Sequence, residues 1–319
     1  MNGQLPTDIQ DLLSDLDREL GMIGNEYPAQ LETEPAPETI YHYTDDNGLK
    51  GIVESGTLWC TDVFYLNDPS ELKYGVSIAT DMVAASTTGA PLEAQNFARD
   101  FRRHGASAVE GVAHFFVCSL SKKGNDLGQW RAYGANGRGY TIGFDGKKLE
   151  QAFTTRACQA VHEHITFPVS YDEARLRSIY KRLVDKVLPL IQPPAGRGLS
   201  DEVVEEYMLS LRVSLALQVY RTALFFKHPA YAPEEEYRLM QVHYADRLPT
   251  DVKFRSRPHT LLRYREFDWK NVAPDALTHI FIGPACDARI SGRFVNDCLR
   301  AYFPTAQPRM NLSGIPYRP

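Results

Sequence analysis

The chain has 319 residues and a net charge of −5, with 43% hydrophobic and 24% charged residues. This composition is that of a globular protein, and the acidic balance argues against a duplex-DNA coat, which needs excess cations to neutralise phosphates. No apolar run approaches the roughly 20 residues that span a bilayer, and no secretory signal is visible, so we expect no membrane partner. The five scattered cysteines contain no Cys-x-x-Cys pair, so we expect a cytoplasmic protein without a metal site.

The start of the chain is predicted to differ from the rest. Residues 1–23 contain an N-terminal helix over 7–23, where apolar residues recur at three- and four-residue spacing. Residues 24–38 are rich in Pro and Glu, which is typical of a linker. Three roles stay open for the helix: it packs on the body, mediates self-association or binds a partner.

Residues 39–319 are predicted to form a single domain. It opens with a strand over 39–44, a helix over 45–56 that ends at Gly56, and a strand over 57–62. Further on, helices are expected over 70–86, 91–104, 172–191, 201–227 and 287–303, and strands within 108–121, 137–145, 160–171, 236–244 and 277–286. Strands and helices do not alternate regularly. We therefore predict an α+β fold with mixed, mostly antiparallel sheets and surrounding helices.

The first candidate functional residues lie around the strand over 39–44. His42 and Thr44 share a face of it, because alternate residues of a strand point the same way. A lone strand histidine is usually structural, but the neighbouring hydroxyl favours a functional one. After the second strand, residues 67–70 have turn chemistry. Tyr65 and Tyr74 frame that turn and can form two walls of a slot for a planar ring.

The next candidates follow the apolar run that ends at Ser121. Ser119 and Ser121 share one face of that predicted strand. The Gly-rich loop beyond carries Trp130 and Arg131, and a guanidinium can bind two phosphate oxygens. A structural salt bridge explains Arg131 equally well. Neither a Gly-x-Gly-x-x-Gly nor a phosphate-loop lysine motif is present.

Two acids mark the start of a later strand. Glu234 and Glu236 stand at alternate positions, so both can face one cleft. Acids at the start of an apolar strand are unfavourable unless they reach solvent or a positive partner. An exposed strand edge is the alternative interpretation.

These motifs, taken in order, resemble a bacterial family known only as a domain of unknown function. The resemblance rests on YHYT, YLNDPSE, SLS, QWRAYG, GYTIGFD, EEEYR and IGP, and it covers about residues 39–317. The chain also resembles, more distantly, ADP-ribosyltransferases of the His-Tyr-Glu class, which begin with His-x-Thr on a strand, a helix, and Gly-x-Leu opening the next strand. That resemblance implies an ADP-ribosyltransferase-like core with a split sheet.

The second resemblance also implies roles for the candidate residues. His42 would hold the ribose of NAD, Tyr65 and Tyr74 would stack on the nicotinamide, and Glu236 would stabilise the oxocarbenium-like transition state. Ser119 and Ser121 look like the Ser-x-Ser strand of the related arginine-type class, so the pattern is mixed. The implied site comprises catalytic His42 and Glu236, NAD-binding Thr44, Tyr65, Tyr74, Ser119, Ser121 and Arg131, and acceptor-binding Glu234 and Trp130.

We therefore expect an NAD-dependent enzyme that transfers ADP-ribose to a nucleic acid or a protein, as a toxin or phage-defence effector. NAD is its substrate, and no metal is needed. One alternative is a non-catalytic nucleotide- or nucleic-acid-binding module that uses Tyr65, Trp130 and Arg131. Another is an NAD glycohydrolase on the same scaffold. His42 and Glu236 in one cleft would favour an enzyme, whereas a Glu236 salt-bridged away from His42 would favour the module.

Overall fold

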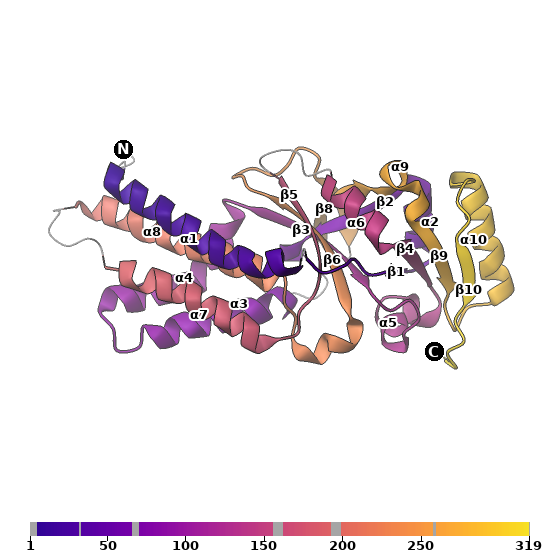
Figure 1. Ribbon diagram of the computed structural model, residues 1–319, viewed down its shortest axis with the longest axis horizontal. Helices are drawn as coiled ribbons and strands as arrows, with labels where there is room; N and C mark the ends of the chain where they lie inside the picture. Colours follow the sequence, from indigo (N-terminus) through magenta and orange to yellow (C-terminus); the bar gives the residue numbers. More distant parts are fainter. Residues whose placement is uncertain are drawn as a thin grey trace.

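The computed structural model describes residues 5–31, 33–65, 70–155, 162–192, 199–257 and 260–318. Figure 1 shows long helices at one end of the molecule and a twisted sheet with shorter helices at the other. The long helices are α1 (Thr7–Leu31), α3 (Ser70–Ser86), α4 (Leu92–Glu110), α7 (Glu173–Val187) and α8 (Asp201–Ala223). The shorter ones are α2 (Asp46–Ser55), α5 (Leu127–Ala132), α6 (Gly146–Thr155), α9 (Trp269–Val272) and α10 (Ala288–Tyr302). Among the described residues, no helix is long and apolar enough to cross a membrane.

The strands of the described residues form one open sheet. In chain order they are β1 (Thr39–Thr44), β2 (Thr57–Asp62), β3 (His114–Ser121), β4 (Tyr140–Asp145), β5 (His162–Pro168), β6 (Glu236–His243), β7 (Lys253–Arg257), β8 (Thr260–Asp268), β9 (Leu277–Ile282) and β10 (Arg309–Leu312). Their spatial order is β10-β9-β4-β1-β3-β2-β8-β7, and β5 and β6 branch off through the pairing of β6 with β3. Only the β9–β10 pair is parallel among the described strand pairs. The predicted mixture of helices with a mostly antiparallel sheet is confirmed.

The branch at β3 opens the sheet. β6 pairs with β3 along its whole length, so it occupies one edge of that strand. β1 and β2 share the other edge. β1 reaches it at Ser121, whereas β2 reaches it at Phe116 and Val117. The sheet therefore splits beside the intervening residues 118–120, and the candidate site lies at this split.

Two apolar cores hold the elements around the split. One core joins the long helices to β3, β5 and β6, and it includes Phe101, Phe115 and Phe167. The other lies between the sheet and α2, α6, α9 and α10, and it includes Phe144 and Trp269. Burying such large aromatic side chains is worth several kcal/mol each, about 2–3 at the usual area coefficient. Both cores reach β3, so the strand that carries the split is anchored on both faces.

The predicted strand–helix–strand unit over 39–62 is confirmed. The side chain of Asp45 accepts a hydrogen bond from the N–H of Gly48 at 2.7 Å, which caps the start of α2. Gly56 ends the helix with φ 71°, the left-handed conformation that favours glycine. This turn leads directly into β2.

The helix predicted over 7–23 is longer than expected. It continues through residues 24–31, which the composition assigned to a linker. Tyr27 and Pro28 are buried inside it, and the ring of Tyr27 lies 5.0 Å from that of Phe226. This packing outweighs the weak helix propensity of the segment. α1 packs along α7 and α8, which is the first of the three roles left open for it.

Candidate functional site

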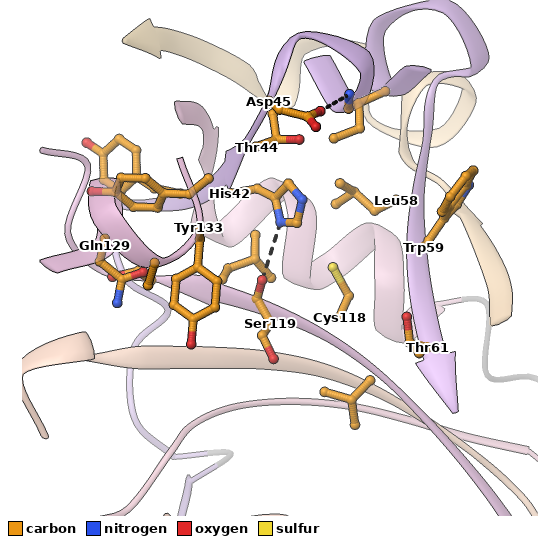
Figure 2. Close-up of a pocket in the computed structure, with 18 of the residues that line it drawn as sticks. His42, Thr44, Asp45, Leu58, Trp59, Thr61, Cys118, Ser119, Gln129 and Tyr133 are labelled. Atoms are coloured by element: carbon orange, nitrogen blue, oxygen red, sulfur yellow. Dashed lines mark hydrogen bonds between the residues drawn. The ribbon is translucent and has the colours of Figure 1, made fainter. Parts of the chain in front are cut away.

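A cavity of about 690 Å³ lies at the split of the sheet. It is lined by residues of β1, β2, β3, α5 and β7, and by the segment that leads into β6. Figure 2 shows His42 in its middle, with Tyr133 on one side and Trp59 on the other. The volume lies in the range of pockets that hold drug-sized ligands, and such pockets usually carry a few convergent polar groups.

His42 bridges the split from β1 to β3. Its Nδ1 lies 3.3 Å from the carbonyl oxygen of Ser119, so Nδ1–H donates and Nε2 carries a lone pair. Burial lowers the pKa of His42 below its ordinary value, although the bond to Ser119 acts in the opposite direction. The ring is therefore neutral at physiological pH and offers Nε2 as a hydrogen-bond acceptor.

Glu234 and Glu236 reach the same cavity as His42, together with Lys227. The Nζ of Lys227 lies 2.6 Å from Oε2 of Glu234 and 3.2 Å from Oε2 of Glu236. Arg238 binds Glu236 through two hydrogen bonds and also donates to the carbonyl of Leu224 at 2.8 Å. Lys227, Glu236 and Arg238 are at most 5% exposed. The four side chains thus form a compact, charge-balanced group at one end of the cavity.

The charges of this group determine the protonation of Glu236. Burial, the largest single effect, would raise its pKa, but the charges of Arg238 and Lys227 lower it. Hydrogen bonds from Arg238 and the Ser119 hydroxyl act in the same direction and help hold the pKa of Glu236 well below its ordinary value. Glu236 is therefore an ionised carboxylate that faces the cavity.

The two acids do not reach the cavity by strand alternation, which was the expected route. Glu235 between them has φ 43°, a left-handed conformation that is strained for a non-glycine residue. Glu236 begins β6, whereas Glu234 ends a short 3-10 helix. The backbone N–H of Glu236 donates to the Tyr171 hydroxyl at 3.0 Å, which holds the start of the strand.

Ser121 braces this turn. Its hydroxyl donates to the carbonyl of Glu234 at 2.7 Å and accepts from the N–H of Lys123 at 3.0 Å. Ser121 and Thr44 both line the cavity, as do His42 and Ser119. The structure thus brings six of the predicted site residues together: His42, Thr44, Ser119, Ser121, Glu234 and Glu236.

Residues 129–135, from α5 onward, form one wall of the cavity, here called the α5 wall. The Tyr133 hydroxyl donates to Oε1 of Glu234 at 3.2 Å. The adjoining Ala135 and Asn136 both have positive φ, 49° and 55°, and Ala135 lines the cavity. Two tethers from the C-terminal segment fix this wall. The Ser313 hydroxyl donates to Oδ1 of Asn125 at 2.7 Å, and the Tyr317 hydroxyl donates to Oδ1 of Asn136 at 2.6 Å.

The expected slot between Tyr65 and Tyr74 is not part of the cavity. The Tyr65 ring lies beneath Arg263, whose guanidinium carbon is 4.7 Å from the ring centre. The Tyr74 hydroxyl donates to Glu173 of α7 at 2.8 Å, so packing between helices directs it elsewhere. The turn at 67–70 falls largely on residues 66–69, which lie outside the described residues.

Trp130 and Arg131 also lie off the cavity. Trp130 is fully buried, packs edge-on against Tyr43 and donates from Nε1 to Asn125 at 2.8 Å. It is a core residue of α5, which corrects its expected contact with an acceptor. Arg131 is exposed on the same short helix and does not line the cavity.

Among the cavity residues that the sequence did not assign to the site, four bear on its chemistry: Trp59, Tyr133, Lys227 and Arg255. Trp59 is 42% exposed although its neighbours Leu58 and Cys60 are buried. An aromatic residue at the outward position of a buried strand is the signal that was available. Nothing in the local sequence marks Arg255, because its partner Thr61 lies almost 200 positions away. The ion-pair partners of Lys227, by contrast, follow it within nine positions. No group of side chains suited to a metal ion occurs within the described residues.

A family model described as "Protein of unknown function (DUF2971)" matches residues 129–239. The matched segment runs from α5 to β6, so it contains Lys227, Glu234 and Glu236 but not His42. No curated protein and no solved structure matches the chain. The resemblance to ADP-ribosyltransferases has no support from these comparisons.

Proposed function

We propose that this protein binds NAD in the cavity at the split sheet and transfers its ADP-ribose group to an acceptor. One observation carries the proposal: His42, Ser119 and the two acids Glu234 and Glu236 line a single cavity, although they come from three separate strands and a short 3-10 helix. A pocket that combines a neutral imidazole with an ionised carboxylate is a candidate catalytic site.

His42 has the chemistry to hold a ribose. Because its Nδ1–H is directed at Ser119, Nε2 can accept a hydrogen bond from a sugar hydroxyl. The lowered pKa keeps this acceptor unprotonated at neutral pH. A ribose held at Nε2 would have its reactive carbon in the same cavity as the acids.

The acids supply the electrostatics that the reaction needs. In the proposed step the bond between the ribose carbon and the nicotinamide nitrogen breaks, and its electron pair leaves with nicotinamide as a neutral molecule. Positive charge then develops on the ribose, and a fixed carboxylate stabilises it. The acceptor forms the new bond to that carbon and gives its proton to a base. Glu236 is the immobile carboxylate, and Glu234, with a side chain 19% exposed, is the base that an acceptor can reach.

Tyr133 is an aromatic residue of the cavity that contacts one of these acids. Its hydroxyl binds Glu234, so its ring lies at the acidic end of the cavity. We assign the contact with the nicotinamide ring to Tyr133 in place of Tyr65 and Tyr74. Stacking on a planar ring holds the leaving group in position while its bond breaks.

A second candidate function is a non-catalytic nucleotide-binding module. It is favoured by the ion pairs of Glu236, which give that side chain a full structural explanation. In this case the cavity binds a nucleotide and the carboxylate only anchors β6. The two candidates differ in whether NAD is cleaved.

The test is to incubate the purified chain with NAD and to follow nicotinamide release and the ligand-induced shift in melting temperature. We expect release, reduced roughly 100- to 1,000-fold in Glu236→Gln and strongly reduced in His42→Ala. Glu173→Gln is the matched control, because it removes an acid that is ion-paired on α7 away from the cavity. Release without a labelled acceptor would identify water as the acceptor, as in an NAD glycohydrolase. A melting shift without release would favour the binding module. The absence of both release and a melting shift would refute NAD binding.

A further inference from the structure

The wall of the cavity around Trp59 is built on one face of the sheet. In the β2–β8 and β7–β8 ladders, Thr61 stands opposite Tyr264, and Tyr264 stands opposite Lys253. Directly paired residues of antiparallel strands point to the same side, and so do residues two apart. Trp59, Thr61 and Arg255 therefore project from the same face, and all three line the cavity.

Arg255 is oriented by the other two residues of this wall. Its guanidinium carbon lies 5.3 Å from the centre of the Trp59 ring, a cation–π contact. Its Nη2 donates to the Thr61 hydroxyl at 3.3 Å. The side chain is half-buried, so the charge lies at the cavity wall and not in open solvent. An arginine held in this way is prepared to bind a planar pair of anionic oxygens.

The position of Arg255 relative to the acids fits an extended ligand. Thr61 pairs with Val117 of β3, whereas Glu236 pairs with Ser121, four residues further along the same strand. Four residues of a strand span roughly 13 Å. The cavity therefore has a carboxylate end and a guanidinium end, and His42 lies between them beside Ser119.

We propose that Arg255, oriented by Trp59 and Thr61, binds a phosphate group of a nucleoside diphosphate ligand in this cavity. The identification of that ligand as NAD rests on the proposed function, in which the acids face the ribose. The cationic wall itself does not depend on the reaction. A diphosphate next to a ribose places its anionic oxygens away from Glu234 and Glu236, which would repel them, and towards the opposite wall.

The test is calorimetric titration of the full chain with ADP-ribose and with inorganic pyrophosphate. We expect Arg255→Gln to weaken ADP-ribose binding roughly 10- to 100-fold, as expected for the loss of a charge-assisted pair. We expect the same change to abolish pyrophosphate binding. Arg255→Lys should restore part of the affinity, because it keeps the charge but not the fork. Lys253→Gln is the matched control: it removes the same charge from β7, where Lys253 is paired with Glu266 at 2.7 Å outside the cavity.

The outcomes separate this inference from the proposed function. Equal ADP-ribose affinity in the wild type and in a folded Arg255→Gln variant would overturn the inference, even if NAD is cleaved. So would an absence of both ADP-ribose and pyrophosphate binding by the wild type. Binding that depends on Arg255, without nicotinamide release, would support the inference while the transferase proposal fails. Unchanged melting temperatures without ligand establish that each variant is folded.

Discussion

Arg238 holds the carboxylate of Glu236 through two hydrogen bonds, from Nε to Oε1 at 2.6 Å and from Nη2 to Oε2 at 3.1 Å. The two residues stand two positions apart on β6, so they share a face of the strand. Arg238 is 2% exposed and Glu236 5%. A carboxylate that is held this rigidly needs no reorganisation when charge develops beside it. Its removal takes one acceptor away from each of two buried cations, Lys227 and Arg238.

Breaking this pair should destabilise the fold strongly. We expect Arg238→Met to lower the free energy of unfolding by about 3–5 kcal/mol, because it leaves a buried carboxylate with less compensation. Urea unfolding measures this loss. Arg177→Met is the comparison, since Arg177 forms an exposed pair with Glu173 and should cost less than about 1 kcal/mol. Similar losses in the two variants would contradict the role of the buried pair.

The stability due to Glu236 should depend on pH. Its pKa is depressed in the folded state, so the stabilisation is present above the unfolded pKa and is lost as pH falls through the folded one. We expect wild type to be more stable than Glu236→Gln at pH 7 and the difference to shrink below about pH 4. Urea unfolding of both proteins from pH 3 to 7 measures it. A difference that does not change with pH would show that folding leaves the pKa of Glu236 at its unfolded value.

Asp62 should show the opposite pH dependence. Burial raises the pKa of Asp62 to about 6, although Arg263 Nε lies 3.0 Å from it. The folded state therefore binds the proton more tightly than the unfolded state, and stability is lost as pH rises from about 4 to 6. Relative to Asp62→Asn, which does not titrate, wild type should lose about 3 kcal/mol over this range. Parallel stability curves for the two proteins would contradict this assignment.

Ligand affinity should separate Tyr133 from the predicted tyrosines. If Tyr133 contacts the nicotinamide ring, Tyr133→Ala should weaken NAD binding about tenfold or more, since stacking is worth roughly 1–3 kcal/mol. Tyr74→Ala removes a ring of similar size that is bonded to Glu173, so NAD affinity should not change. Calorimetric titration with NAD measures both variants. A loss of NAD affinity in Tyr74→Ala alone would favour the slot between Tyr65 and Tyr74 that the sequence predicts.

Short-range sequence preferences predicted the strand–helix–strand unit around His42, but they did not predict how the rest of the site assembles. The strand over 39–44, the cap at Asp45 and the turn at Gly56 follow from short-range preferences, so the surroundings of His42 were predictable. The meeting of His42 with Glu236 depends on β3, which pairs with β1 on one edge and β6 on the other. No local pattern specifies which strands pair.

The errors have the same origin. Tyr65 and Tyr74 are close in sequence, but a hydrogen bond to Glu173, nearly a hundred positions away, directs Tyr74 to the helices. Trp130 looked available beside Arg131, yet Tyr43 from β1 covers it. The linker composition of 24–31 was overridden by the packing of Tyr27 on Phe226. In each case a partner far away in the sequence determines where the side chain lies.

The tethers from Ser313 and Tyr317 to the α5 wall have a consequence for protein synthesis. A ribosome releases His42, Ser119 and Glu236 long before these two residues, so a nascent chain contains the polar groups of the cavity while its α5 wall is still unbraced. Asn136, held in a left-handed conformation, gains its tyrosine partner last. The cavity therefore becomes complete only after residues 313–317 have been synthesised, and a chain stalled after β9 would carry the cavity's polar groups without its finished shape.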